Sequence, residues 1–348
     1  MSDNLCQELM VEILTKLPPK SLPRFRSASK SLRSCIDSPD FIRKHTCRSR
    51  QRVLLIHKVK QTHKYKRYRD ASFCTLHAKE QLPLPLSLCT TLVVLPCRKA
   101  TLLGSCNGIL LLYENGVISL WNPSIMRQLT LPDCPLQECF GGMAIGLGFD
   151  PITDDNKVVS AWHPIDSPMP LYSEVLSSAC YLNGVLHWVV ERYYPIYRTW
   201  VHYIMTFDLS SHVFGMIALP KPSWYIEKLA TIQGSLAMIS SVAYDSWLWV
   251  RGEAEDSWSV VSKLKTKDGA ELRKVLELTN NGDHLLLDFL QEFYVYTPKT
   301  GSLSRLVDFY DASSLVDMDT YVETLQLLHI GTACEEATPL FLQDSSFK

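Results

Sequence analysis

The sequence lacks paired cysteines. Its 11 cysteines lie scattered from Cys6 to Cys334, and no C-x-x-C pair occurs among them. Zinc sites of the paired-cysteine kind are therefore excluded. In a reducing compartment we expect these thiols to be buried or idle, because free cysteine packs much like a small hydrophobic side chain. We expect no metal and no cofactor.

Long apolar runs are also missing. No run approaches the roughly 20 residues that a membrane-spanning helix needs, and the opening residues MSDNLCQELM lack the basic-then-apolar order of a signal peptide. We therefore expect a protein of the cytoplasm or nucleus with no membrane partner. Hydrophobic residues make up 46% of the 348 residues and charged residues only 20%, which favours folded domains over disorder.

Motifs for nucleotide binding, calcium binding or acid–base chemistry are incomplete. Gly146-Leu147-Gly148 lacks the third glycine of a dinucleotide-binding loop, so we expect a strand there. Asp150, Asp154 and Asp155 lack the alternation and central glycine of an EF-hand, which favours an Asp-rich turn. His187 has no nucleophile or carboxylate at a recognisable spacing, so packing is favoured over catalysis. A metal site assembled from distant histidines is an open but disfavoured alternative.

Charge is distributed unevenly along the chain. Residues 1–69 hold 17 Lys and Arg against 5 Asp and Glu, a balance of +12, whereas residues 70–348 carry a balance of −13. Residues 43–69 contain eleven basic and no acidic residues. This run favours a solvated connector that encloses one strand at Val53–His57. Nucleic-acid binding, with Tyr65 and Tyr68 as stacking groups, is the disfavoured alternative because the remaining body is acidic.

Apolar residues recur at helical spacing in the first forty residues. Pro18 and Pro19 separate two stripes, and Ser21 is a plausible N-cap for the second, which stops before Pro39. The pattern predicts two or three short helices, which either dock onto the rest of the chain or present their leftover apolar face to a partner. The first stripe comprises Leu5, Leu9, Ile13 and Leu17, widened by Met10 and Leu14, and the second comprises Leu22, Phe25, Ala28, Leu32 and Ile36.

Short apolar runs separated by turn residues follow residue 70 and predict an all-β domain. Two kinds of hairpin unit recur in it, which suggests sheets arranged radially in a β-propeller whose blade number the irregular spacing leaves open. The first kind is a turn that feeds a strand, at Asn107-Gly108, Asn183-Gly184 and Gln233-Gly234. The second kind is an aromatic strand end before a polar or proline turn, at Trp121-Asn122-Pro123-Ser124, Phe207-Asp208-Leu209-Ser210 and Tyr296-Thr297-Pro298.

These residues carry a family resemblance. LCQELMVEILTKLPPKSLPRFRSASKSLRSCIDSPDFIRKH, from Leu5 to His45, resembles the F-box of plant proteins, with Cys6 where the family usually has proline and Leu32 where it usually has tryptophan. GLGFDPITDDNKVV at 146–159, YLNGVLHWV at 181–189, MTFDLSSHVFGMIALP at 205–220 and YVETL at 321–325 resemble the plant F-box-associated domain, which is kelch-like. We expect an F-box at 1–45, a basic connector or first strand at 46–70, and a β-propeller-like domain at 71–345.

The resemblance implies a non-catalytic subunit of an SCF (Skp1, cullin, F-box) ubiquitin ligase. Its F-box would dock on a Skp1-like adaptor, and through it on cullin and RING subunits, while the β domain binds a protein to be ubiquitinated and degraded. The alternatives are a relic F-box on a scaffold or sugar-binding propeller, and a propeller hydrolase or oxidase. By matching positions, adaptor contacts should fall on Leu5, Leu9, Ile13, Leu14, Leu17, Pro18, Leu22, Phe25 and Ile36.

Charge also predicts how the propeller closes. Residues 306–347 contain eight Asp and Glu and no Lys or Arg, in contrast to the basic run at 43–69. Closure of a propeller brings its first and last strands together. We therefore expect these two segments to lie side by side.

Overall fold

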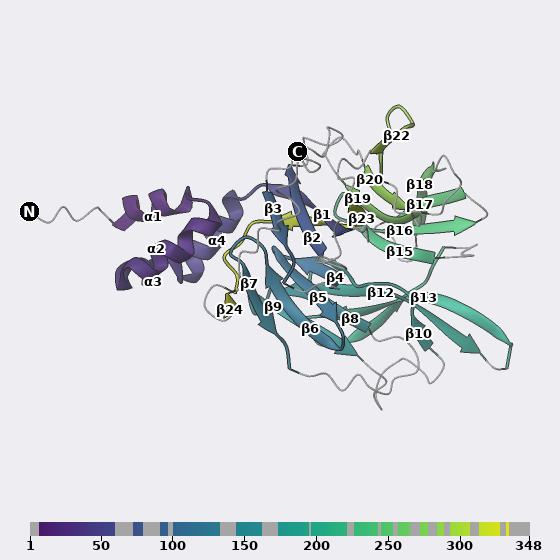
Figure 1. The fold of residues 1–348 in the computed structure, drawn as a ribbon. Coiled ribbons are helices and arrows are strands. Elements are labelled where there is room, and N and C mark those ends of the chain that lie inside the picture. Colours follow the sequence, from purple (N-terminus) through teal and green to yellow (C-terminus); the bar gives the residue numbers. More distant parts are fainter. Residues whose placement is uncertain are drawn as a thin grey trace, which may run out of the picture.

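The computed structural model of the chain describes residues 7–59, 72–78, 91–96, 100–132, 144–161, 173–194, 196–220, 226–242, 245–252, 257–264, 272–277, 284–288, 293–306, 313–327 and 332–333. A bundle of short helices lies at one side of a larger body made of strands (Figure 1). The expected fold class, a small helical domain followed by an all-β propeller, is confirmed.

The two or three short helices predicted from the stripes are three in the structure, and a further helix begins at Pro39, beyond the second stripe. Ser29 breaks the second stripe, because its backbone is extended (φ −155°, ψ 157°) and its side chain accepts a hydrogen bond from the Leu32 N–H. No helix in the described part of the chain has the length and apolar content needed to cross a bilayer. The elements are α1 (Gln7–Thr15), the 3₁₀ turn η1 (Pro19–Ser21), α2 (Leu22–Ala28), α3 (Lys30–Ile36) and α4 (Pro39–Arg48).

The expected N-cap at Ser21 is wrong. Ser21 has helical backbone angles and makes no side-chain cap hydrogen bond, because the chain enters α2 directly from η1. Pro23 lies in the first turn of α2 and has no N–H to satisfy, so a cap is needed less there. Ser38 does cap α4, since its hydroxyl accepts from the Phe41 N–H at 3.3 Å.

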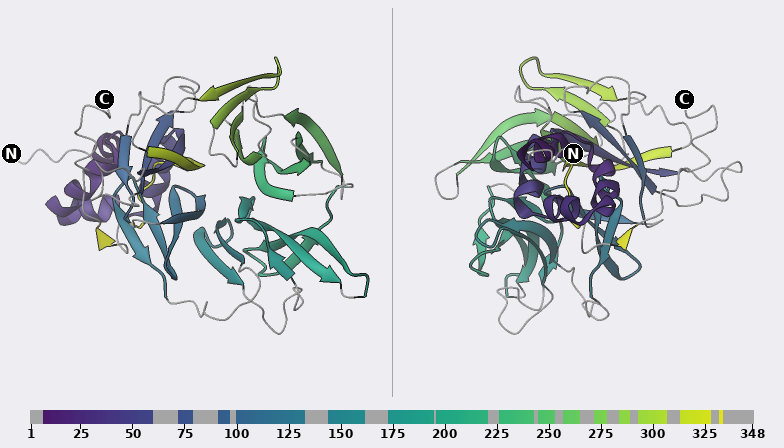
Figure 2. Two further views of the ribbon diagram at one scale, coloured as in Figure 1. Left: turned by 45° about the vertical axis from the view of Figure 1, so that its right-hand side comes forward. Right: turned by 90° about the vertical axis from the view of Figure 1, so that its left-hand side faces the viewer.

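The strands form six antiparallel sheets in the described residues. The sheets follow one another round a centre, as the left view of Figure 2 shows, and β23, β4, β8, β11, β15 and β19 contact one another in turn to close the ring. The sheets comprise β1 (Gln51–Val59), β2 (Ser72–Ala78), β3 (Thr91–Val94) and β23 (Ser313–Val322); β4 (Thr101–Cys106), β5 (Ile109–Glu114), β6 (Val117–Asn122), β7 (Arg127–Thr130) and β24 (Thr332–Ala333); β8 (Ala144–Asp150) and β9 (Asp155–Ala161); β10 (Ser173–Val175), β11 (Cys180–Leu182), β12 (Val185–Tyr194), β13 (Thr199–Asp208) and β14 (Phe214–Ile217); β15 (Ile226–Ile232), β16 (Ser235–Val242), β17 (Asp245–Arg251) and β18 (Trp258–Leu264); and β19 (Leu272–Glu277), β20 (His284–Asp288), β21 (Phe293–Thr297) and β22 (Ser302–Leu306).

Both kinds of predicted hairpin unit are present. Asn107-Gly108, Asn183-Gly184 and Gln233-Gly234 have positive φ at both residues, as type I′ turns require, and each joins an inner strand to the next strand of its sheet. The aromatic strand ends belong to β6, β13 and β21, each of which pairs with the strand that follows it. Local turn chemistry therefore marks equivalent positions in different sheets.

The first and last parts of the propeller pair directly. β1 and β23 are antiparallel neighbours, which confirms the predicted proximity of the basic and acidic segments where both are described. An ion pair also links the two segments, between Arg52 Nη2 of β1 and Oε2 of Glu323, the residue after β23, at 3.7 Å. Asp317 and Asp319 of β23 instead face Lys274. Closure thus rests on the backbone ladder and on core residues such as Leu54 and Tyr321 more than on opposite charge.

Candidate partner-binding surfaces

The helical bundle has its own core, and part of that core comes from the propeller. Leu14, Leu22 and Ile36 are at most 3% exposed. They pack with Phe41 and Ile42 of α4 and with two propeller residues, Ile125 and Leu325. The three side chains were named among the adaptor contacts, but they fill this core and offer no surface to a partner.

Other named residues remain on the surface of the helical bundle. Leu9, Ile13 and Phe25 are 47%, 48% and 41% exposed. Leu9 and Ile13 are four residues apart on α1 and therefore lie on one face of that helix. Pro18 is exposed and Leu17 is half-buried, whereas Leu5 lies outside the described residues. The bundle thus buries one apolar face and leaves large apolar side chains of α1 and α2 in water.

The corner between α1 and α2 is held by residues that the sequence did not single out. His45 of α4 places its Nε2 3.1 Å from the Leu17 carbonyl oxygen. Arg48 donates to the Thr15 hydroxyl at 2.6 Å. Arg26 and Asp37 form a bidentate ion pair with distances of 2.6 and 2.9 Å. The first two contacts hold α4 against the chain at Thr15 and Leu17, next to Pro18, and the third joins α2 to the end of α3. These long-range contacts could not be predicted from local spacing.

Polar contacts also attach α4 to the propeller. Arg43 Nη1 lies 2.7 Å from Asp154 Oδ2, in the turn between β8 and β9. The hydroxyls of Thr46 and Thr324 are 3.3 Å apart. Together with Ile125 and Leu325, these contacts make the helices one packed unit with the propeller, with α4 beside it (Figure 1). The helices therefore dock onto the rest of the chain, as one of the two expectations held, and they also keep an exposed apolar face.

The surface of the helical bundle is basic. Lys20, Arg24, Lys30 and Lys44 are exposed and have no carboxylate partner among the described residues. Three acidic groups of the bundle are paired within it: Glu12 with Lys16 at 3.3 Å, Asp37 with Arg26, and Asp40 with Arg43. The exposed apolar residues of α1 and α2 therefore lie in a field that favours an acidic partner.

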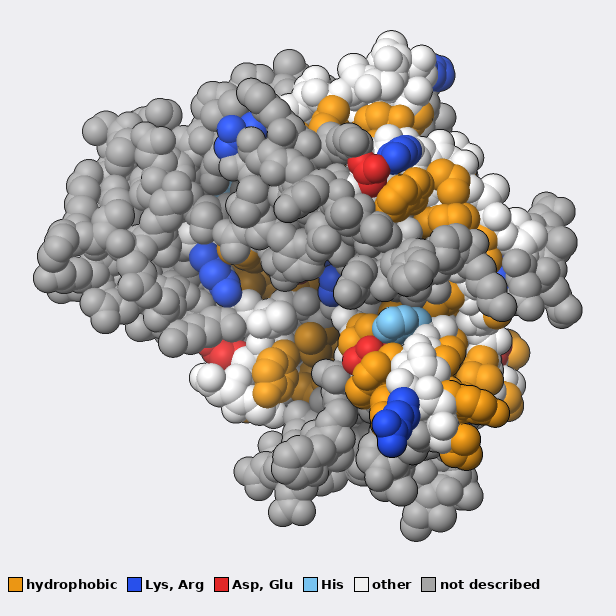
Figure 3. Space-filling view, turned by 90° about the vertical axis from the view of Figure 1, so that its right-hand side faces the viewer, with side chains coloured by type: hydrophobic (Ala, Val, Ile, Leu, Met, Phe, Trp, Pro, Cys, Tyr) orange, Lys and Arg blue, Asp and Glu red, His pale blue; other side chains and the backbone are white. Residues whose placement is uncertain are grey.

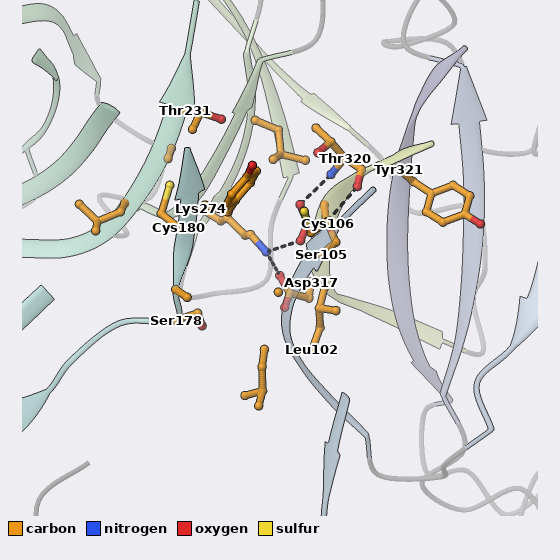
Figure 4. Close-up of a pocket in the computed structure, with 18 of the residues that line it drawn as sticks. Leu102, Ser105, Cys106, Ser178, Cys180, Thr231, Lys274, Asp317, Thr320 and Tyr321 are labelled. Atoms are coloured by element: carbon orange, nitrogen blue, oxygen red, sulfur yellow. Dashed lines mark hydrogen bonds and ion pairs between the residues drawn. The ribbon is translucent and has the colours of Figure 1, made fainter. Parts of the chain in front are cut away.

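A second candidate surface is the pocket at the centre of the propeller. Its volume is about 480 Å³, and it is lined by the inner strands β4, β11, β15, β19 and β23. Figure 4 shows Lys274 pointing at Asp317, with Nζ 3.0 Å from Oδ1, and Asp319 Oδ2 lies 4.0 Å from the same nitrogen. Burial raises the pKa of Asp319, and Lys274 opposes that rise. None of the described lining residues is a histidine.

The two thiols at this pocket are poor nucleophiles at neutral pH. Burial raises the pKa of Cys106 to about 12, with a contribution from Asp319. Burial likewise raises the pKa of Cys180 to about 12. Because the thiolate is the reactive form of cysteine, both groups behave as packing residues. The sequence prediction of buried or idle thiols holds for these two.

The residues considered for other chemistry have structural roles. Gly146 and Gly148 lie in β8, as expected of a strand. Asp150 caps the turn that follows, and its Oδ2 accepts from Lys157 Nζ at 2.6 Å, which holds the pKa of Asp150 well below its usual range. His187 is buried with Nδ1 3.1 Å from the Cys180 carbonyl oxygen, and burial lowers its pKa. The described residues contain no cluster of three or more potential metal ligands.

Comparison with known proteins assigns both parts of the chain. The F-box domain family matches residues 2–44, and the family described as "F-box associated beta propeller domain" matches residues 160–307. A protein of Arabidopsis thaliana named as an F-box protein, At4g09190, is 30% identical over 272 residues, which cover 72% of this chain and 68% of the relative. The F-box/kelch-repeat protein At3g23880 of the same plant is 25% identical over 364 residues, covering 92% of this chain and 95% of the relative. The chain therefore belongs to the F-box proteins that carry an F-box-associated β-propeller domain.

Proposed function

We propose that this chain is the substrate-recognition subunit of an SCF-type ubiquitin ligase. Its α1 and α2 helices dock on a Skp1-like adaptor, which connects the chain to cullin and RING subunits, and its propeller binds the protein to be ubiquitinated. The observation that carries the proposal is the exposure of Leu9, Ile13 and Phe25 in a domain that matches the F-box family. Large apolar side chains in water are the usual anchors of a protein interface.

The burial of individual side chains supports a smaller set of adaptor contacts within this proposal. Leu9, Ile13, Leu17, Pro18 and Phe25 have surface that an adaptor can cover, whereas Leu14, Leu22 and Ile36 support the bundle from inside. An acidic adaptor would also be attracted by the exposed basic side chains of the bundle, which speeds encounter more than it adds affinity.

We infer that the chain is not itself catalytic. The thiols at the central pocket have raised pKa values, so they do not supply the thiolate that covalent ubiquitin transfer uses. In this proposal, the transfer chemistry belongs to the other subunits of the ligase. The contribution of this chain is to hold the target at a fixed position relative to the adaptor, through the packed contact of α4 with the propeller.

Reconstitution of the complex tests this function. The full chain is expected to co-purify with a recombinant Skp1 homologue and, through it, with cullin. Leu9→Asp combined with Phe25→Asp should abolish co-purification, because both changes place charge on the exposed apolar face. The matched control is Val213→Asp combined with Val260→Asp, which puts charge on exposed valines of the propeller. Failure of the wild-type chain to bind any adaptor would favour a scaffold or sugar-binding propeller with a relic F-box.

A further inference from the structure

One hairpin projects beyond its own sheet. β12 and β13 pair over ten positions, from Val185 with Asp208 to Tyr194 with Thr199. Among the described residues, the neighbouring strands are shorter: β10 pairs with β12 only as far as Arg192, and β14 pairs with β13 only from Ile204 onward. In the part of the chain that the structure describes, the distal end is therefore a two-stranded ribbon that extends past the neighbouring strands (Figures 1 and 2).

The distal end of this hairpin exposes large apolar side chains. We define the hairpin tip as residues 192–194 and 196–201. Ile196 and Tyr197 are 90% and 75% exposed, and Trp200 and Val201 are also exposed. Hydrophobic side chains are prominent on the face of the molecule that carries the hairpin (Figure 3). Because these side chains are exposed to water and are not packed in a core, they contribute little hydrophobic stabilisation to the propeller.

The aromatic rings of the tip are already ordered. Tyr193 and Trp200 are cross-strand partners whose ring centroids lie 5.0 Å apart. The Arg192 guanidinium lies 4.4 Å from the centroid of the Tyr194 ring. Ordered tyrosine, tryptophan and arginine side chains give a large contact area at a small cost in conformational entropy, and these residue types dominate binding hot spots.

The charge of the tip is opposite to that of the domain that bears it. Residues 192–201 contain Arg192 and Arg198 and no acidic residue, whereas residues 70–348 as a whole carry −13. The neighbouring Glu191 is engaged by His202, with 3.2 Å between Oε2 and Nε2. Two arginines among exposed apolar side chains fit an acidic segment that also carries large apolar residues. An acidic propeller with two cations at the tip is poorly suited to a polyphosphate backbone.

We propose that the hairpin tip is a docking surface for an acidic, apolar segment of the target protein. Tyr197 and Ile196 enter contact with apolar side chains of that segment, and Arg198 pairs with its carboxylates. The assignment rests on the proposed function, because it names the part of the propeller that binds the target protein. It places target binding on the outer hairpin and not in the central pocket.

Selection from a random 12-residue peptide library displayed on phage, with the full-length protein as bait, tests this docking surface. Selected peptides are expected to be enriched in Asp and Glu next to Leu, Ile or Phe. The binding of these peptides should fall at least about tenfold in Tyr197→Ser combined with Arg198→Glu. The matched control, Val261→Ser combined with Lys299→Glu, removes one exposed apolar group and reverses one exposed charge elsewhere, and should bind like the wild type.

The remaining outcomes separate the alternatives. Peptides without acidic enrichment, or peptides that bind the tip variant as tightly as the wild type, would overturn the assignment. The assignment would also be overturned if a single-stranded oligonucleotide or phosphatidylserine vesicles bound more tightly than any selected peptide and this binding were lost in the tip variant. Adaptor binding of the tip variant is measured in parallel and should be unchanged. A tip variant that loses peptide binding but keeps adaptor binding therefore supports the hairpin tip as the docking surface. A wild-type chain that binds no adaptor contradicts the proposed function but not the peptide-binding role of the tip.

Discussion

The side-chain amide of Asn122 donates a hydrogen bond to the carbonyl of Thr324, which lies 202 positions later in the chain, at 3.0 Å. The same amide donates to the Gln326 carbonyl at 2.8 Å. The hydroxyl of Thr324 in turn meets that of Thr46 on α4. The segment that follows β23 is thus hydrogen-bonded to the propeller on one side and to the helical bundle on the other. Closure of the ring and attachment of the helices therefore depend on the same segment.

Asn122→Ala should destabilise the protein by about 2–3 kcal/mol, because two carbonyls lose a donor in a buried place. The free energy of unfolding from urea titration measures this loss. Thr130→Ala, at an exposed position of β7, is the control and should change the value by less than about 0.5 kcal/mol. Equal stability of the Asn122 variant and the control would show that the closure does not depend on this side chain.

Leu325→Ala should loosen the helical bundle although the residue belongs to the propeller. Leu325 is fully buried against Leu14, Leu22 and Ile36. A leucine-to-alanine change in a core costs about 2–5 kcal/mol through the cavity that it leaves. Amide hydrogen exchange is expected to quicken in α1–α4 more than in β15–β18. Faster exchange confined to the propeller would contradict a shared core.

Two glycines in similar turns should respond very differently to alanine. Gly108 has φ +76°, and a Cβ there would lie 2.0 Å from the Val322 carbonyl oxygen. Gly116 has φ +87° but open space within 4 Å. Gly116→Ala should cost only the left-handed backbone strain of about 1–2 kcal/mol, whereas Gly108→Ala must also displace the strand that closes the ring. Thermal unfolding of the two variants compares these losses, and similar melting temperatures would contradict the close packing at Gly108.

The stability of the protein should fall as the pH decreases below about 6.5. His57 and His77 both place Nε2 2.8 Å from the Thr75 hydroxyl, and burial lowers their pKa values to about 3 and about 4. The unfolded chain takes up protons near pH 6.5 while these folded imidazoles stay neutral, so the two groups lower stability by up to about 2.7 kcal/mol per pH unit between pH 6 and 4.

Other groups modify this pH profile in known directions. His187 also has a lowered pKa and adds to the loss, whereas Asp319 has a raised pKa and opposes it. Asp150 and Asp208 have lowered pKa values and contribute a loss only at more acidic pH, below their ordinary titration. Urea titrations from pH 7.5 to 4.5 measure the profile, and His57→Gln combined with His77→Gln should flatten it. A wild-type profile that is flat over this range would contradict neutral burial of the two imidazoles.

Local chemistry in the sequence predicted much of the propeller. The Asn-Gly and Gln-Gly turns could be predicted because glycine readily adopts positive φ, and the structure has positive φ at both residues of each turn. The break at Ser29 was not predicted. A serine within a helical pattern can continue the helix or cap a new one, and only the extended backbone seen in the structure shows that Ser29 is a cap. The signal for α4 was present in Ser38-Pro39, a capping serine followed by proline at the first helical position.

Spacing could not predict which apolar residues of the helices are buried and which are exposed. Ile13 and Leu14 are adjacent, yet one is exposed and the other is buried. Periodicity shows which residues share a helix face, but the residues that cover a face, here Ile125 and Leu325, come from distant parts of the chain. The central pocket was missed for the same reason, because five inner strands each contribute to its lining.

The dissociation constant between a purified Skp1 homologue and the full chain, measured by calorimetry, tests the central claim most directly. Leu9→Ser combined with Phe25→Ser should weaken binding by about 2–4 kcal/mol, or roughly 30- to 1,000-fold, while the free energy of unfolding changes little. Val213→Ser combined with Val260→Ser should leave the constant unchanged. An adaptor that binds the Leu9 and Phe25 variant as tightly as the wild type would contradict the claim that the exposed face of α1 and α2 receives the adaptor.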